Sequence, residues 1–314
     1  MKVLVTGGLG YLGCIVVQRL LKEGFEVRVL DSMLYGKHID EKKLGFELMQ
    51  GDVRNTDTIS KALENVDAVI HLAAIVGEPA VNLDKENSVN VNYLAVRELA
   101  QLAKEKDVRL VFTSTCSVYG ASTGKLLNEK SKVFPLSIYA ISKLAAEEAI
   151  EKINGDFVIF RLGTLFGLSP RMRFDLVVNR FVAQGIQDKK ISVFGGSQFR
   201  PFVHVQDVAN AFVKVIKTDN KGLFNLGGSN YRISDLAELL AEKTDCEVVT
   251  IKEIKDPRNY AVDSKLFEKA FGLRFEKNVE FAINEIMDAY SHKVVKNYKE
   301  PIYNNEEWLR RQTK

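Results

Sequence analysis

The sequence predicts an α/β protein built on a doubly wound parallel sheet, with a smaller mixed α/β lobe beside it. Three observations lead to this prediction. Short β-branched runs alternate with helical patterns in the first half, a glycine-rich turn follows the first run, and the alternation loosens after about residue 165. Strands that alternate with helices form right-handed βαβ units, which align the strands in parallel and cover both faces of the sheet.

The expected strands of this sheet are runs rich in Val, Ile, Leu and Phe, at 2–6, 26–30, 46–50, 67–71, 108–112 and 157–161. Between them, apolar residues recur at helical spacing, which predicts amphipathic helices at 11–23 and 87–106. In the second half, similar stripes predict helices near 234–243, with Ser234 as N-cap, and near 278–292.

These elements suggest how the chain is divided. We expect residues 1–165 to form the sheet domain, with 202–228 returning to it. Residues 166–201 and 229–314 are then expected to form the smaller lobe.

The composition excludes several classes of protein. Of 314 residues, 44 are basic and 41 acidic, with no basic block, so a nucleic-acid partner is not indicated. Three cysteines without CxxC spacing argue against a disulfide framework or a metal site. The chain enters a strand at once and has no apolar run of membrane-spanning length, so we expect a cytoplasmic protein with no membrane contact.

The glycine-rich turn predicts a dinucleotide site. Gly7, Gly10 and Gly13 lie three apart between the first strand and the first helix, and Tyr11 and Leu12 belong to the same turn. Glycines there let the backbone turn sharply and approach a pyrophosphate, which the N–H groups of the helix N-terminus bind. Glycines also serve ordinary turns, and the flanking strand and helix favour the dinucleotide interpretation.

Acidic residues at the ends of the next two strands indicate which dinucleotide binds. Asp31 closes the second strand and can accept hydrogen bonds from the adenosine ribose, while Ser32 and its neighbours offer no Arg for a 2′-phosphate. The cofactor is therefore expected to be NAD. Asp52 and Val53 follow the third strand; Asp52 could flank the adenine or cap the helix near Asn55, and both alternatives stay open.

A tyrosine and a lysine indicate redox chemistry. Tyr139 and Lys143 lie four apart and therefore on one helical face, where the ammonium favours the phenolate and lowers the tyrosine pKa. Such a pair alone is a common accident on helices. Here it follows the glycine turn, Asp31 and the hydroxyl-rich segment "TSTCS" at 113–117, which could hold a substrate oxygen or only satisfy loop backbone.

At this point the chain closely resembles the extended short-chain dehydrogenase/reductases, specifically the nucleotide-sugar epimerase/dehydratase family with its UDP-glucose 4-epimerase-like members. The resemblance covers nearly the whole chain and rests on landmarks in the family's order, namely "TGGLGYLG", "GDVR", "HLAA", "STCSVYG", "YAISK" and "RPFVHVQDV". The fold it implies is the Rossmann fold.

The resemblance implies roles for individual residues. Thr115 takes the place of the catalytic Ser/Thr, Tyr139 becomes the base, and Lys143 holds the nicotinamide ribose. NAD binding is implied for Gly7, Gly10, Tyr11, Leu12, Gly13, Asp31, Ser32, Asp52, Val53, Leu72, Ala73, Ala74, Asn90, Thr113, Tyr139, Lys143 and Leu162. Contact with a nucleotide-diphosphate sugar is implied for Thr115, Asn179, Arg200 and Arg258.

Two departures from the family pattern bear on the reaction. Similar sugar 4,6-dehydratases have Asp and Glu directly after the catalytic Thr, whereas this chain has Cys116 and Ser117, so dehydration is disfavoured. The segment 163–165 reads Gly-Thr-Leu where galactose-type epimerases carry an aromatic pair and Asn. His204, between Val203 and Val205, is expected to be structural.

We therefore predict an NAD-dependent enzyme, a nucleotide-sugar 4-epimerase that transiently oxidises C4. An NDP-sugar 4-dehydrogenase or ketoreductase would use the same residues, and a non-catalytic NAD-binding protein is a third alternative. The resemblance also implies a homodimer formed through the helices at about 87–105 and 138–152.

Overall fold

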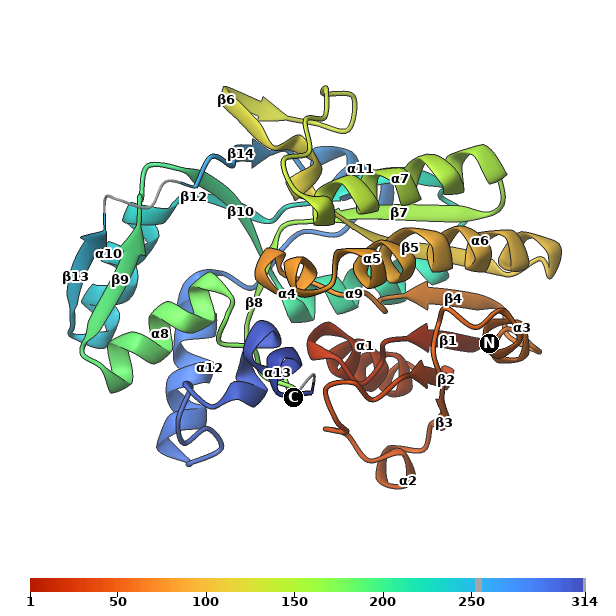
Figure 1. Ribbon diagram of the computed structural model, residues 1–314, viewed down its shortest axis with the longest axis horizontal. Coiled ribbons are helices and arrows are strands. Elements are labelled where there is room, and N and C mark those ends of the chain that lie inside the picture. Colours follow the sequence, from red (N-terminus) through yellow and green to blue (C-terminus); the bar gives the residue numbers. More distant parts are fainter. Residues whose placement is uncertain (252–255, 313–314) are drawn as a thin grey trace.

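The computed structural model describes residues 1–251 and 256–312; residues 252–255 and 313–314, within the expected smaller lobe, lie outside the described residues. A seven-stranded sheet forms the centre of the larger part (Figure 1). Every neighbouring pair in it is parallel, as predicted. In spatial order its strands are β11 (Gly222–Leu226), β7 (Phe157–Leu162), β5 (Arg109–Thr115), β4 (Ala68–His71), β1 (Lys2–Thr6), β2 (Glu26–Asp31) and β3 (Glu47–Gln50).

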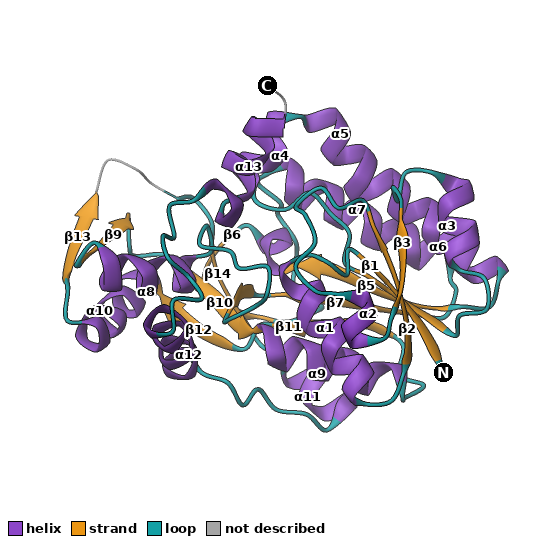
Figure 2. Ribbon diagram, turned by 90° about the horizontal axis from the view of Figure 1, so that it is seen from below, coloured by secondary structure: helices purple, strands orange, loops and turns teal. Residues whose placement is uncertain are grey.

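Helices cover both faces of this sheet, which is the predicted doubly wound arrangement (Figure 2). One face carries α1 (Tyr11–Lys22), α9 (Val205–Ile216) and α11 (Lys265–Phe271). The other carries α3 (Thr56–Ala62), α6 (Ala95–Glu105) and α7 (Ile138–Ile153). The connections include α2 (Glu41–Leu44), α4 (Glu78–Leu83), α5 (Lys85–Val89), η1 (Asn90–Leu94) and η2 (Cys116–Tyr119).

The central strand β1 shows why the first half reads as uninterrupted apolar runs. Successive side chains of a strand point to opposite faces, so Val3 and Val5 pack in the cluster that contains α1, while Leu4 packs in the cluster that contains α6. All three are fully buried. A strand covered on both faces therefore has no polar face to alternate with its apolar one.

The smaller lobe contains two short sheets and three helices (Figure 1). A three-stranded sheet joins β8 (Thr164–Phe166), β10 (Phe199–His204) and β12 (Ser229–Arg232), and a pair joins β9 (Lys190–Phe194) and β13 (Glu247–Ile251). The helices are α8 (Val177–Gln187), α10 (Ile233–Thr244) and α12 (Val279–Ser291). A further strand pair, β6 (Ala121–Leu127) with β14 (Asn259–Val262), and the terminal η3 (Pro301–Tyr303) and α13 (Asn305–Gln312) complete the described elements.

Three local predictions differ from the structure. The helix expected at 87–106 is divided, because the single π-helical turn η1 separates α5 from α6. Ser234 is not the N-cap of α10; Arg232 occupies that position, and the Ser234 hydroxyl contacts Asp235 instead. The strand expected at 108–112 is longer than predicted, since β5 spans Arg109–Thr115 and includes the first three residues of the hydroxyl-rich segment.

Candidate active site

A cavity of about 500 Å³ opens at the carboxyl ends of β1, β2, β4, β5 and β7 and reaches Arg258 and Tyr260 at β14. This is the edge at which doubly wound sheets bind their ligands. Most of the residues singled out above line it: Gly7, Gly10, Tyr11, Leu12, Gly13, Asp31, Ser32, Asp52, Val53, Leu72, Ala73, Ala74, Thr113, Thr115, Tyr139, Lys143, Leu162 and Arg258.

The glycine turn has the shape that a phosphate cradle requires. Gly7 has φ +71°, and a Cβ on it would come within 2.7 Å of the Ala73 nitrogen. A Cβ on Gly13 would lie 2.2 Å from the Gly7 carbonyl oxygen. Gly10 stands at the N-terminus of α1 without a side-chain cap, so the backbone N–H groups there are directed at the cavity rather than at a capping residue.

Asp31 lies where a ribose would be held. Its carboxylate accepts hydrogen bonds from the backbone N–H groups of Leu9 (3.0 Å) and Met33 (2.8 Å), which fix its orientation. Burial nevertheless raises the pKa of Asp31, because it disfavours the charged form. Each carboxylate oxygen keeps a lone pair for a ribose hydroxyl.

The two alternatives for Asp52 are now distinguishable. Asn55 caps α3 by accepting the Thr58 N–H at 2.8 Å, so Asp52 is not the cap. Its carboxylate binds the Arg54 guanidinium, which lowers the pKa of Asp52, and it lines the cavity. Asn90, in contrast, does not line the cavity; the π-helical turn that begins there presents Val91, and α5 presents Asn87.

The hydroxyl row at the end of β5 divides into structural and cavity-facing members. The Thr113 hydroxyl donates to the His71 carbonyl at 2.9 Å, and the Ser114 hydroxyl bonds the buried carboxylate of Glu147. Thr115 Oγ1 accepts the Ser117 N–H at 3.1 Å, which leaves its own proton to donate toward Tyr139. The Cys116 thiol is buried against the Arg161 carbonyl, and burial raises its pKa, as expected for a packed residue.

Tyr139 and Lys143 line the cavity together, and burial rather than the nearby amine has the largest influence on the pKa of Tyr139. Burial raises the pKa of Tyr139 to about 12, and the strongest opposing influence is the charge of Arg173, followed by the hydrogen bond from Thr115. The charge of Lys143 is not among the leading influences on the pKa of Tyr139. The Lys143 Nζ donates to the Thr113 carbonyl at 2.9 Å, and burial lowers the pKa of Lys143 itself to about 7.

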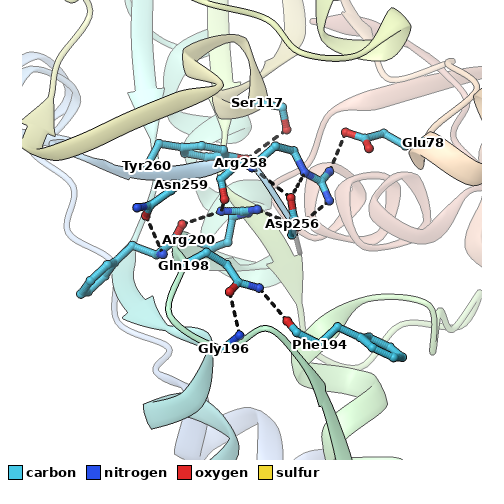
Figure 3. A network of polar contacts seen from close by, with 11 residues as sticks. Glu78, Ser117, Phe194, Gly196, Gln198, Arg200, Asp256, Arg258, Asn259 and Tyr260 are labelled. Atoms are coloured by element: carbon cyan, nitrogen blue, oxygen red, sulfur yellow. Dashed lines mark hydrogen bonds and ion pairs between the residues drawn. The ribbon is translucent and has the colours of Figure 1, made fainter. Parts of the chain in front are cut away.

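Two arginines of the substrate side share one carboxylate (Figure 3). Arg258 donates to Asp256 at 2.8 and 2.7 Å and to Glu78 at 2.6 Å, and only Arg258 of the pair lines the cavity. Arg200 is buried behind it, donates to Asp256 at 2.8 Å and bonds the Arg258 carbonyl. The structure therefore gives Arg200 the task of holding the Asp256–Arg258 segment.

Asn179 also lies away from the cavity lining. It is fully buried, and its amide accepts the Gly167 N–H (3.0 Å) while donating to the Tyr11 hydroxyl (3.0 Å) and the Arg173 carbonyl (2.9 Å). These bonds occupy the side chain in joining α8 to the first turn of α1. His204 is equally internal, capping α9 and bonding Glu285 at 2.8 Å.

The departure at residue 163 has a packing cause. A Cβ on Gly163 would come within 2.7 Å of the Gly227 carbonyl oxygen and 3.1 Å of the Pro201 carbonyl oxygen. The close approach of these backbones therefore excludes a larger side chain there. Thr164 and Leu165, which follow it, line the cavity.

Several cavity residues were missed by sequence reasoning. Glu78, Tyr260 and Asn305 all line the cavity, and the sequence analysis assigned none of them to it. Each is brought there from a loop or from a distant part of the chain. Arg171 and Arg173, which the sequence places at the substrate or at the entrance to its pocket, also line the cavity, and Arg173 forms a bidentate pair with Asp175 at 2.9 and 2.7 Å.

Neither a metal centre nor a membrane span is found within the part of the chain that the structure describes. No group of three or more His, Cys, Asp or Glu side chains there could hold a metal ion. Over the same residues, no helix is both long enough and apolar enough to cross a membrane.

The sheet, the glycine turn and the tyrosine–lysine pair define the class: a dinucleotide-binding α/β protein with a redox site at the carboxyl edge of its sheet. A sequence profile described as the NAD dependent epimerase/dehydratase family matches residues 3–227. The chain belongs to this family, whose members are NAD-dependent enzymes that act on nucleotide sugars.

Individual relatives differ in their reactions. The chain is 31% identical over 260 residues to UDP-glucuronic acid decarboxylase 1 of Arabidopsis thaliana, a match that covers 78% of this chain and 59% of the relative. It is 30% identical over 243 residues to an uncharacterized UDP-glucose epimerase, YtcB, of Bacillus subtilis, covering 69% and 72%. The UDP-glucose 4-epimerase of Thermus thermophilus in complex with NAD superposes with a TM-score of 0.79 at 25% identity, over 92% of this chain and all of that one.

The site is chemically suited to NAD, the family's cofactor. The uncapped N-terminus of α1 and the glycines around it suit a pyrophosphate, and Asp31 offers acceptors to a ribose. The buried guanidinium of Arg171, which lines the same cavity, has an Nε without a hydrogen-bond partner and so could meet an anion there.

Proposed function

We propose that this protein is an NAD-dependent nucleotide-sugar 4-epimerase that oxidises and re-reduces C4 of the sugar. The observation that supports this proposal most is the set of residues that line the cavity around Tyr139. Thr115, Tyr139 and Lys143 line one cavity with the glycine turn and Asp31. The positions after Thr115 hold no carboxyl group that could eliminate water: Cys116 is buried, and the Ser117 hydroxyl is 3.1 Å from the Tyr260 hydroxyl.

Tyr139 is the proposed base. Its phenolic oxygen would take the proton of the C4 hydroxyl, while the Thr115 hydroxyl donates a hydrogen bond to the same region. NAD, when bound, supplies the oxidising equivalent for C4. With a pKa of about 12, Tyr139 needs its phenolate stabilised during the transfer, and the positive charge of Arg173 does this most strongly.

Lys143 is proposed to hold the nicotinamide ribose rather than to set the pKa of Tyr139. Its Nζ is held by the Thr113 carbonyl and lies 4.8 Å from the centre of the Phe112 ring, which fixes the amine at the cavity wall. An ammonium has three donors, so two remain for ribose hydroxyls of the cofactor. Of the two roles that the family resemblance implies for Lys143, holding the nicotinamide ribose and lowering the tyrosine pKa, this proposal keeps the first.

The diphosphate of the sugar nucleotide is proposed to bind Arg258. This guanidinium is 30% exposed, faces the cavity and is oriented by Asp256. A diphosphate that pairs with Arg258 would compete with Glu78 for the same Nη1. Arg200 would act through Asp256 as a positioning residue. We also propose that residues 166–201 and 229–314, apart from α11, which packs on the large sheet, form the substrate-binding lobe.

Proton NMR of sugar nucleotides tests the proposal directly. UDP-, dTDP-, GDP- and CDP-hexoses and UDP-glucuronate would be incubated with the enzyme without added coenzyme. The proposal expects a new anomeric signal that grows beyond enzyme stoichiometry, with no net NADH. A keto sugar formed once per active site would indicate a dehydrogenase, and a pentose nucleotide formed from UDP-glucuronate would indicate a decarboxylase like the Arabidopsis relative. Either result would overturn the 4-epimerase proposal.

A further inference from the structure

Arg171 is a buried cation whose hydrogen-bonding capacity is incompletely used. It lies between β8 and α8, is 2% exposed and lines the cavity. Its Nη2 donates to Asn305 Oδ1 at 2.7 Å, whereas its Nε has no hydrogen-bond partner. The neighbouring carboxylate of Asp175 is already held by Arg173 through two bonds. A buried guanidinium with an unpartnered N–H group destabilises the folded protein unless an anion binds to it.

The loop that carries Arg171 is fixed over the first turn of α1. The Tyr11 hydroxyl donates to the Gly167 carbonyl at 2.6 Å, and the Ser169 hydroxyl donates to the Tyr11 carbonyl at 2.7 Å. These bonds place the start of the loop beside the glycine turn. They are buried, so the loop does not have to be ordered by a ligand.

The guanidinium itself reaches toward the ribose side of the cavity. Its central carbon lies 4.4 Å from the centre of the Tyr35 ring, and Tyr35 follows Asp31 by four residues. Arg171 therefore links the loop over the glycine turn to the loop that follows the proposed ribose ligand. Between a pyrophosphate-binding helix N-terminus and a ribose-binding carboxylate, the group to be expected is a phosphate.

We propose that Arg171 binds the pyrophosphate of the dinucleotide, with Asn305 as the positioning residue that holds it there. The planar guanidinium, which lines the cavity, would donate to a phosphoryl oxygen, while its position over the Tyr35 ring and its bond to Asn305 fix its plane. The phosphate is then held by the N–H groups of α1 and by a cation contributed from the segment that leads into the smaller lobe.

Asn305 is suited to this positioning role because it joins several walls of the cavity. It is 1% exposed, and its amide nitrogen also donates to the Val76 carbonyl at 3.2 Å. Three residues further on, the Trp308 indole N–H donates to the Leu34 carbonyl at 2.7 Å. Helix α13 packs against α4, as Figure 2 shows. The segment around Asn305 thus fastens the loops on both sides of the Arg171 guanidinium.

The test is the NAD dissociation constant of coenzyme-stripped protein, measured by titration calorimetry. A charge-assisted hydrogen bond to phosphate predicts that Arg171→Met raises Kd for NAD about 10- to 100-fold. Arg171→Lys should lie between the wild type and Arg171→Met, because charge is kept and the planar fork is lost. Asn305→Ala should raise Kd about 3- to 10-fold in the wild type but should add nothing to Arg171→Met, since it acts through that residue.

Arg180 provides the matched control. It too has a buried Nε without a partner and lies over the rings of Phe181 and Phe194, but it does not line the cavity. Arg180→Met should therefore leave Kd for NAD unchanged. If Arg180→Met and Arg171→Met raised the Kd for NAD equally, the loss of affinity would be explained by loss of packing, and the proposal would be overturned.

Two further outcomes would also overturn it. Unchanged NAD affinity with weakened UDP binding in Arg171→Met would assign the residue to the sugar nucleotide. Additive effects of Asn305→Ala and Arg171→Met would remove the positioning role. The inference depends on the family's use of NAD and not on the reaction proposed above, so an inactive or differently active enzyme leaves the binding test intact.

Discussion

Tyr139 shows how far a residue's chemistry depends on its surroundings rather than on its motif. The four-residue spacing to Lys143 predicts a pKa lowered by an ammonium, but Lys143 is bonded to a backbone carbonyl and has a depressed pKa itself. The charge that most lowers the pKa of the phenol comes from Arg173, which lies outside the Tyr139–Lys143 pair. In this site the base is therefore tuned from the smaller lobe's side of the cavity.

Removal of the Arg173 charge should move the pH profile of catalysis. Because that charge lowers the pKa of Tyr139, Arg173→Met raises it, and the limb of kcat that rises with pH should shift to higher pH by about 1 unit. Arg173→Lys should keep the wild-type limb. The double variant Arg173→Met with Asp175→Asn controls for the effect of leaving the Asp175 carboxylate buried and unpaired. If the rising limb of its kcat–pH profile were not shifted, Arg173 would not have this role.

Lys143 should make the stability of the coenzyme-free protein depend on pH. Its pKa falls from an ordinary 10.5 to about 7, so between pH 7 and 9.5 the unfolded chain binds this proton and the native state does not. The free energy of unfolding should therefore rise with pH, by at most about 1.4 kcal/mol per unit from this group. Denaturant titrations of wild type and Lys143→Met would measure it, and identical slopes would contradict the prediction.

At the scale of elements, a buried ion pair holds the catalytic helix to the sheet. Glu147 of α7 pairs with Arg161 of β7 at 2.6 Å and also accepts from Ser114 of β5. Both partners of the pair are nearly inaccessible. The pair thus fixes α7, which carries Tyr139 and Lys143, to β7, and the bond from Ser114 fixes the same helix to β5, the strand that carries Thr115.

Breaking this pair should be costly. Glu147→Ala leaves a buried guanidinium without its carboxylate and should lower the free energy of unfolding by about 3–5 kcal/mol. Glu148→Ala, one position along on the exposed side of the same helix, should change it by no more than about 0.5 kcal/mol. Chemical denaturation of the two variants makes the comparison, and equal effects would mean that the pair does not anchor α7.

The elements also show which features could be predicted from the sequence. The strands, the glycine turn and the order of motifs are local, so periodicity and spacing reveal them. The resemblance implied NAD binding for Asn90, whereas the described cavity is lined by Asn87 and Val91 on either side of the start of the π-helical turn, a local feature that periodicity does not signal. The sequence does not reveal that Arg200 pairs with Asp256, 56 residues away, or that Asn305 contacts Arg171 across 134 residues, because such contacts depend on the tertiary structure.

At the scale of the whole molecule, the expected homodimer remains to be tested. Large apolar side chains are exposed near the two helices implicated in it: Ile141 of α7 is 53% exposed, and Leu94, at the start of α6, is 39% exposed. Ile141→Glu together with Leu94→Glu should yield a monomer in light scattering where wild type is a dimer, with Leu266→Glu, 47% exposed on α11, as control. A wild type that is monomeric at all concentrations would contradict the expectation.

In the proposed 4-epimerase reaction, the hydrogen at C4 leaves for NAD and returns to the same carbon. A deuterium label at C4 follows this hydrogen. Nucleotide hexoses deuterated at C4 would be incubated with the enzyme in ordinary water, and the product examined by NMR and mass spectrometry. We expect a product with inverted configuration at C4 that retains the deuterium at that carbon, without deuterium in free NADH. Loss of the deuterium to solvent, or its transfer to NADH with a keto sugar as end product, would contradict it.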